Sequence, residues 1–171
     1  MRRTSVVVVA CLLALGGCGG SDGISAADLT QQQDAVDDVA RTVVAALVDD
    51  LGAAAPSADS LGRGLYAGCD GGDPDQASYF VDTFVTYDVR DPARAADEVS
   101  AAVRKAGLRA SGVAMTDGAH LTSGDVSIDL SSQDKGGGSA GQNIFVSSGC
   151  LAIGKNQIST FNAKNGRPVT P

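Results

Sequence analysis

The first eighteen residues of the chain, MRRTSVVVVACLLALGGC, decide the compartment in which the rest must fold. Arg2 and Arg3 give the segment a positive start, residues 6–15 are apolar, and two glycines precede Cys18. This order is typical of an export signal. An apolar helix of this length rises only about 15 Å, half the thickness of a bilayer, so it is too short to remain as a spanning anchor. We therefore expect residues 1–17 to be removed.

The small residues in front of Cys18, Leu15-Gly16-Gly17, resemble the lipobox of bacterial lipoproteins. The resemblance implies that Cys18 becomes the first residue and carries diacylglycerol, often with a further acyl chain such as palmitate. One acyl chain holds a protein only marginally, whereas two or three hold it firmly. We therefore expect attachment to the extracytoplasmic face of the cell membrane through a flexible tether over residues 18–25. A plain secretory signal with an incidental cysteine is the alternative.

The four cysteines limit which covalent cross-links the chain can form. Cys11 would leave with the signal and Cys18 would be acylated, so Cys69 and Cys150 are the two thiols left in an oxidising compartment. Their pairing in a disulfide is the prediction. A metal site would need further ligands, and the single histidine, His120, is far from both in sequence. We expect neither a metal nor a cofactor.

The net charge limits the classes of partner that the protein can bind, and the length limits the number of domains. The formal net charge is −7, and loss of the two signal-segment arginines takes it to −9. This excess opposes binding to nucleic acid or to anionic lipid headgroups. The remaining length suits one compact domain. We expect an α+β domain over residues 26–153 and a polar, loosely held tail over residues 154–171.

Two amphipathic helices are predicted. The first covers residues 26–51, with a capping residue at Ser25 and a glycine stop at Gly52. The second begins at Asp91-Pro92 and ends at Gly107. The acidic residues of the first helix, Asp37 among them, are expected to face mostly solvent. The predicted apolar stripes are Val36, Ala40, Val43, Leu47 and Leu51 in the first helix, and Ala95, Val99, Ala102, Val103 and Ala106 in the second.

Alternating residues predict the strands that follow. The clearest strand covers residues 78–89, and residues 53–77 before it read as a long connection. Residues 132–142 are predicted to be a flexible loop. Further strands are expected at 109–115, 125–131 and 143–153, with a short one near 120–122. Together these elements predict a two-layer α+β sandwich, an antiparallel sheet of about four strands with two helices on one face and one disulfide.

Three aromatic residues are candidates for an interaction surface. Phe80 and Phe84 fall on the second face of the strand at residues 78–89, and Tyr66 lies in the long connection. Packing of the two phenylalanines under that connection is the simpler explanation, because such side chains are normally covered. Display on a binding surface is the alternative.

Several short motifs imitate known sites. Residues 137–141, GGSAG, match a nucleophile elbow around Ser139, but no apolar strand precedes them and no helix can follow. Residues 132–135 match SxxK without its companion motifs. The acids of residues 69–75 lack the EF-hand spacing. His120 is more typical of a surface residue than of a catalyst. We expect no catalytic residue.

In organisation, the chain resembles a loose group of small actinobacterial lipoproteins of unknown role. The shared features are the LGGC lipobox, an Asp-capped, Ala-rich helix after a strand, and a final strand ending in SSGC with one cysteine far upstream. The resemblance implies no active-site residues. The expected function is a non-catalytic binding or interaction module of the cell envelope. A carrier of a small apolar ligand or lipid is one alternative, and a hydrolase is another.

Overall fold

A computed structural model describes residues 24–54, 57, 60–69, 75–88, 95–108, 114–115, 118–134, 139–164 and 166–171 of the protein. The predicted signal and Cys18 lie outside these ranges, so their cleavage and lipidation stay predictions. The described helices are α1 (Ala26–Leu51), α2 (Ala95–Lys105) and α3 (Lys155–Ala163). The described strands are β1 (Gly62–Gly68), β2 (Gln76–Asp88), β3 (Ala114–Met115), β4 (Gly118–Ser123), β5 (Val126–Asp134), β6 (Ser139–Ser148), β7 (Leu151–Ala152) and β8 (Arg167–Val169).

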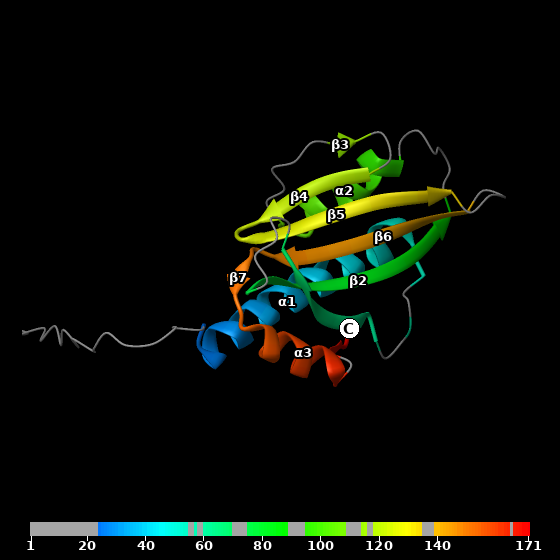
Figure 1. The fold of residues 1–171 in the computed structure, drawn as a ribbon. Helices are drawn as coiled ribbons and strands as arrows, with labels where there is room; N and C mark the ends of the chain where they lie inside the picture. Colours follow the sequence, from blue (N-terminus) through cyan, green and yellow to red (C-terminus); the bar gives the residue numbers. More distant parts are fainter. Residues whose placement is uncertain are drawn as a thin grey trace, which may run out of the picture.

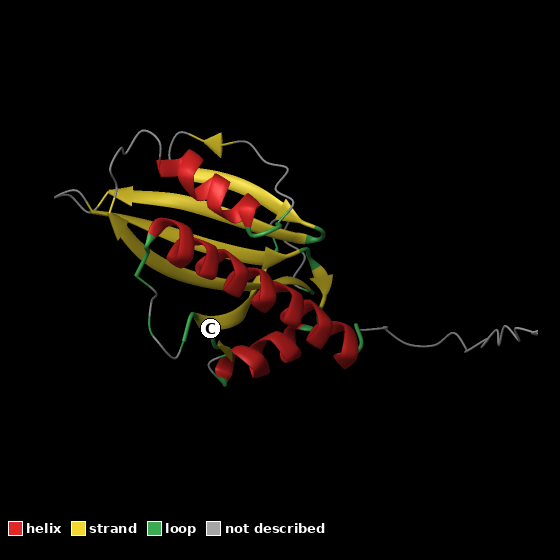
Figure 2. Cartoon of the chain, turned by 180° about the vertical axis from the view of Figure 1, so that it is seen from behind, coloured by secondary structure: helices red, strands yellow, loops and turns green. Residues whose placement is uncertain are grey.

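All eight strands belong to one antiparallel sheet. Seven follow one another in the order β3-β4-β5-β6-β2-β1-β8, and β7 pairs with the start of β2. Helices α1 and α2 cover one face of this sheet, and α3 lies beside α1 at the β1 end (Figures 1 and 2). The predicted α+β architecture with two helices on one face is therefore confirmed. The expected numbers, about four strands and two helices, were too low.

Helix α1 begins and ends where its capping residues predict. The Ser25 hydroxyl oxygen accepts a hydrogen bond from the Asp28 backbone nitrogen at 3.2 Å, and Gly52 ends the helix with a φ of 65°. That left-handed conformation favours glycine. The predicted stripe from Val36 to Leu47 is buried against the sheet, and Ile24 is half-buried in front of the helix. Ile24 and Ser25, which fall within the expected tether, therefore belong to the folded domain, and residues 18–23 lie outside the described residues.

Helix α2 confirms part of its predicted stripe. Ala102 and Val103 are buried, whereas Ala106, predicted to be buried, is exposed one residue after the helix ends. Gly107 has a φ of 85°, in keeping with the predicted glycine stop. The expected start at Asp91-Pro92 and the side chains of Ala95 and Val99 lie outside the described residues.

The core lies between α1, α2 and the sheet. Strand β2 pairs with β6 along most of its length, and β6 pairs in turn with β5. Their alternate residues face the helices, because successive side chains of a strand point to opposite faces. The largest fully buried side chains are Tyr79, Leu47, Leu121, Ile128, Ile144, Ile153, Gln142, Val36, Val43, Val81 and Val85.

Two stretches expected to be irregular contain strands. Strand β1 lies within the predicted connection 53–77, and its three glycines hide it from a search for alternating apolar residues. A Cβ atom at Gly64 would lie 1.6 Å from the Tyr79 hydroxyl oxygen, so the Tyr79 ring passes directly over this glycine. The predicted loop 132–142 is also wrong over most of its length. Strand β5 continues to Asp134, which pairs with Ala140 of β6.

The C-terminal segment is ordered, contrary to the expected loose tail over residues 154–171. Strand β8 pairs with β1, and Val169 is fully buried. In α3, the side chain of Asn162 donates to the Tyr66 carbonyl oxygen at 2.8 Å and accepts from the Tyr66 backbone nitrogen at 3.0 Å. This side chain occupies backbone groups of β1 that β8 leaves free. The segment closes the β1 edge of the sheet.

Candidate functional site

The sheet has one face that α1 and α2 do not cover, visible toward the viewer in Figure 1. We call the outward side chains of β1, β2, β4, β5 and β6 the open face. Directly paired residues share a face, which allows its members to be read from the strand register. All of them are exposed or half-buried. They are Leu65, Phe80, Asp82, Phe84, His120, Thr122, Ser127, Asp129, Ser131, Asn143, Phe145 and Ser147.

Three phenylalanines form the apolar part of the open face. The rings of Phe80 and Phe145 stack with centroids 5.1 Å apart and planes at 25°. The ring of Phe84 lies over Gly141, where an added Cβ would come within 1.8 Å of it. Phe80 and Phe84 are thus on the predicted second face of their strand. Sequence reasoning missed Phe145, although the alternation of residues 143–148 placed it on the other face of the strand from the buried Ile144 and Val146.

A row of four paired residues, three of them polar, crosses the sheet through Phe145. His120 pairs with Asp129, Asp129 with Phe145, and Phe145 with Asp82. The His120 Nδ1 and Asp129 Oδ1 atoms are 2.6 Å apart, and the two side chains are 46% and 50% exposed. Such a pair orients the imidazole and is an ion pair when His120 is protonated. The open face therefore combines aromatic rings with carboxylates, hydroxyls and one histidine.

The GGSAG match around Ser139, for which the flanking residues predict no catalytic site, does not form a nucleophile elbow. Ser139 begins strand β6 and is not on a strand-to-helix turn. It is six residues away from Phe145, which lies in the same row as His120. Six residues of strand span about 20 Å, so Ser139 and His120 are too far apart for a hydrogen bond. Lys135 of the SxxK match lies outside the described residues.

Tyr66 does not belong to the open face, which corrects the prediction that grouped it with Phe80 and Phe84. It is only 6% exposed and points to the helix-covered side, where its ring makes edge contacts with Tyr79 and Phe161 at centroid distances of 5.3 and 5.0 Å. Its hydroxyl oxygen accepts a hydrogen bond from Gln33 at 3.0 Å. Burial raises the pKa of Tyr66. The residue is part of the core.

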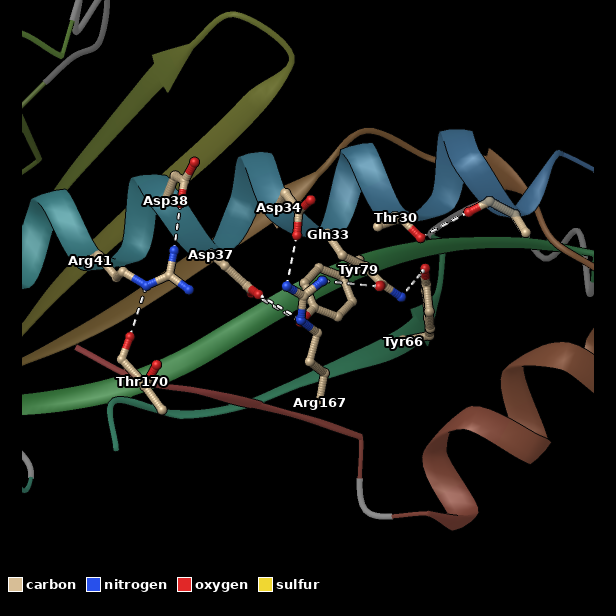
Figure 3. Close-up of polar contacts among 11 residues, drawn as sticks. Thr30, Gln33, Asp34, Asp37, Asp38, Arg41, Tyr66, Tyr79, Arg167 and Thr170 are labelled. Atoms are coloured by element: carbon tan, nitrogen blue, oxygen red, sulfur yellow. Dashed lines mark hydrogen bonds and ion pairs between the residues drawn. The ribbon is translucent and has the colours of Figure 1, made fainter. Parts of the chain in front are cut away.

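A charged cluster joins α1 to β2 and β8 on that covered side (Figure 3). The Tyr79 hydroxyl donates to Asp37 Oδ1 at 3.0 Å, and Arg167 Nε lies 3.2 Å from Asp37 Oδ2. The Arg167 guanidinium also donates to Asp34 Oδ1 at 2.7 Å and to Gln33 Oε1 at 3.4 Å. We call Asp37, Tyr79 and Arg167 the buried triad. The expectation that Asp37 faces solvent was wrong.

Burial dominates the electrostatics of the buried triad. It raises the pKa of Asp37 even though the Tyr79 hydroxyl and the Arg167 charge act in the opposite direction. Burial and the neighbouring Asp37 carboxylate raise the pKa of Tyr79. Asp37 and Tyr79 are both 0% exposed, so neither can meet a substrate from solvent. The buried triad therefore holds α1, β2 and β8 together.

A groove of about 500 Å³ opens at the start of α1, which we call the N-terminal groove. One wall is the first part of α1, and the other is formed by the turn before β5 and the segment that links β6 to β7. Its lining residues are Ile24, Asp28, Gln31, Gln32, Ala35, Asp125, Val126, Ser148, Gly149, Cys150 and Leu151. Sequence reasoning did not find it, because its walls come from opposite ends of the chain.

The predicted disulfide between Cys69 and Cys150 is present and joins residues 81 positions apart. It ties the end of β1 to the wall of the N-terminal groove. Among the described residues, no helix has both the length and the hydropathy needed to cross a membrane. Comparisons with protein families, curated proteins and solved structures found no match. The function must therefore be inferred from these surfaces.

Proposed function

We propose that the chain is a lipid-anchored, extracytoplasmic protein that serves the cell envelope as a non-catalytic binding module, with the open face as its working surface. The anchor is the diacylglycerol on Cys18 that the lipobox resemblance implies. The disulfide between Cys69 and Cys150 supports an oxidising compartment. The formal charge makes nucleic acid an unfavourable partner.

The observation that carries the choice of surface is the position of Phe80, Phe84 and Phe145, which are half-buried on the side of the sheet that α1 and α2 do not cover. Aromatic side chains supply much of the energy of protein interfaces, and they do so best when polar groups surround them. On the open face that polar surround includes His120 and Asp129. A protein or another envelope component that covers the rings would bury them fully.

A photo-reactive residue at position 147 tests the working surface, because Ser147 is the strand partner of Phe80. In intact cells we expect a discrete cross-linked product from this position. The product should disappear in a Phe80→Ser, Phe145→Ser variant that retains its thermal midpoint. The matched control is position 49, since Asp49 is exposed on α1. Equal products from both positions, or a product that survives the double substitution, would contradict the proposal.

The anchor is tested separately. Labelled palmitate should appear on the wild-type protein and not on a Cys18→Ser variant. The variant should also be released from membranes by washing, because removal of the acyl chains removes the attachment. Failure to label the wild-type protein would reject the anchor and leave the binding surface to be judged by the cross-link alone.

A carrier of a small apolar ligand is the second candidate function. The observation that favours it is the N-terminal groove, whose volume of about 500 Å³ falls within the range of about 300–1,000 Å³ that small-molecule sites occupy. Native mass spectrometry of protein purified without added lipid tests this function. A co-purifying apolar molecule supports it, and protein that is free of ligand in every preparation contradicts it.

A further inference from the structure

The N-terminal groove has an apolar floor and an acidic rim. Val126 is buried at its base, and Ile24 and Leu151 are half-buried beside it and pack against the core. Asp28 and Asp125 are exposed at the groove, and no basic residue is among the described residues that line it. A ligand for this site must present an apolar body. Its head must not be a simple anion.

One hydrogen bond links the two walls of the groove, and a second hydrogen bond and the disulfide fix the wall opposite α1. The Gln32 side chain donates to the Gly149 carbonyl oxygen at 3.2 Å, which links α1 to the segment after β6. The Gly149 backbone nitrogen donates to the Asp125 carbonyl oxygen at 3.2 Å. The disulfide of Cys150 fixes the next residue of the same wall. Pre-formed walls favour binding, because little ordering is needed when the ligand enters.

The volume of the groove fits one slender chain. A volume of about 500 Å³ holds about seventeen units of roughly 30 Å³, the share of one water molecule in the liquid, and a methylene group is similar in size. One acyl chain of ordinary length therefore fits, and a pair of chains does not. An acyl chain also matches the floor formed by Ile24, Val126 and Leu151, which offers apolar contact along its length.

The position of the groove indicates the source of that chain. Ile24, which lines the groove, is six residues after Cys18. An extended residue spans at most about 3.6 Å, so Ile24 lies within about 22 Å of the lipid-bearing residue. If Cys18 is anchored as proposed above, the groove stays close to the bilayer surface. A membrane lipid is then the most concentrated apolar ligand available to it.

We infer that the N-terminal groove takes one acyl chain of a zwitterionic, amine-bearing phospholipid from the membrane to which the protein is anchored. Asp28 and Asp125 are exposed residues that line the groove, so they favour an amine-bearing head over a purely anionic one. The inference rests on the proposed anchor for the source of the lipid, and on the groove alone for its ability to bind an acyl chain. It adds a ligand class and a site to the proposed carrier function.

The membrane test uses the full-length, lipidated protein in phosphatidylethanolamine and phosphatidylcholine vesicles that contain a trace of phosphatidylethanolamine with a photoactivatable acyl chain. Labelled peptides should map to residues 24–35 and 148–151. In an Ala35→Trp variant, the indole fills the groove, and the yield of labelled peptide should fall about ten-fold. The matched control is Ala45→Trp, because Ala45 is also an exposed alanine of α1 but lies outside the N-terminal groove. It should label like wild type.

A solution test separates this site from the anchor. The same proteins are titrated with fluorescent lysophosphatidylethanolamine below its micelle concentration, which requires no attachment to vesicles. Binding that Ala35→Trp abolishes, in protein that fails to float with vesicles, rejects the anchor and keeps the site. Protein that floats but binds no probe rejects the site. Equal binding by wild type, Ala35→Trp and a second groove variant, Gln31→Trp, also overturns the inference, as does preference for phosphatidylglycerol probes.

Discussion

Arg167 Nε lies 3.2 Å from Oδ2 of Asp37, a carboxylate with a side chain only 1% exposed, so a residue of the last strand neutralises a charge buried under the first helix. An uncompensated buried charge is costly, whereas a paired one is tolerated. The contact therefore makes the C-terminal segment a requirement for the stability of α1.

Replacement of Arg167 by alanine tests this requirement. We expect the variant to lose about 2–4 kcal/mol of unfolding free energy at neutral pH, somewhat less than a fully buried pair, because the Arg167 side chain is 34% exposed. Urea denaturation measures the loss. Arg104→Ala, an exposed arginine of α2, is the control and should change stability by less than about 0.5 kcal/mol. Equal stability of the two variants would show that the buried triad is energetically unimportant.

A pH series tests the protonation of Asp37. Burial raises the pKa of Asp37 above its ordinary value of 3.8. At a pH between these two values, Asp37 is protonated in the folded protein and ionised in the unfolded chain. This contribution to stability is complete below pH 3.8 and is lost as the pH rises through the raised pKa. An Asp37→Asn variant lacks this titration. The stability of wild type relative to the variant should therefore fall with rising pH.

Urea unfolding of both proteins from about pH 3 to pH 7 measures this difference. Asp49→Asn, a substitution at an exposed position of the same helix, controls for the general effect of one fewer carboxylate. It should track wild type across the series. A constant difference between wild type and Asp37→Asn at every pH would argue against a raised pKa.

The contact between Gly64 and Tyr79 predicts a steric effect. A methyl group at Gly64 would lie 1.6 Å from the Tyr79 hydroxyl oxygen and 2.1–2.6 Å from two ring carbons, and the fully buried ring has little room to move. We expect Gly64→Ala to cost about 1–3 kcal/mol, the range for an overpacked core. Gly68→Ala in the same strand meets nothing within 4 Å and serves as the control. Thermal denaturation should separate the two variants clearly, and similar midpoints would exclude the close contact.

Loss of the disulfide should destabilise the protein substantially. The bond between Cys69 and Cys150 closes a loop over a sequence separation of 81, for which chain entropy gives about 4 kcal/mol. A Cys69→Ser, Cys150→Ser variant should therefore unfold at a lower urea concentration. Wild-type protein treated with reductant should unfold at the same concentration as the variant. A variant as stable as the oxidised protein would mean that the unfolded chain gains no freedom when the bond is absent.

Local signals in the sequence were enough to predict some elements. Ser25 and Gly52 mark both ends of α1, and the alternation around Tyr79 marks β2, because capping and alternation act over a few residues. Cys69 and Cys150 could be paired because so few thiols remained. These features need no knowledge of what packs against them.

Other features depend on neighbours that are distant in the sequence. Asp37 follows Val36 at the border of the apolar stripe, and whether that border is covered depends on Arg167 in a strand of three residues. No periodic pattern is long enough to reveal such a strand. Strand β1 was hidden for a related reason, since Gly64 leaves room for a ring from the next strand instead of contributing a side chain. The N-terminal groove likewise exists only once residues near 24 and 150 meet.

The bonds between α1 and the C-terminal segment also determine when α1 can complete its packing as the chain folds. Asp34 contacts a residue 133 positions later, and Arg41 bonds to the Thr170 carbonyl oxygen 129 positions later. A polypeptide that emerges with its amino end first cannot complete these bonds until residue 170 has followed. Helix α1 therefore lacks its partners in the C-terminal segment until more than a hundred further residues have been synthesised. Such late closure of long-range contacts slows folding.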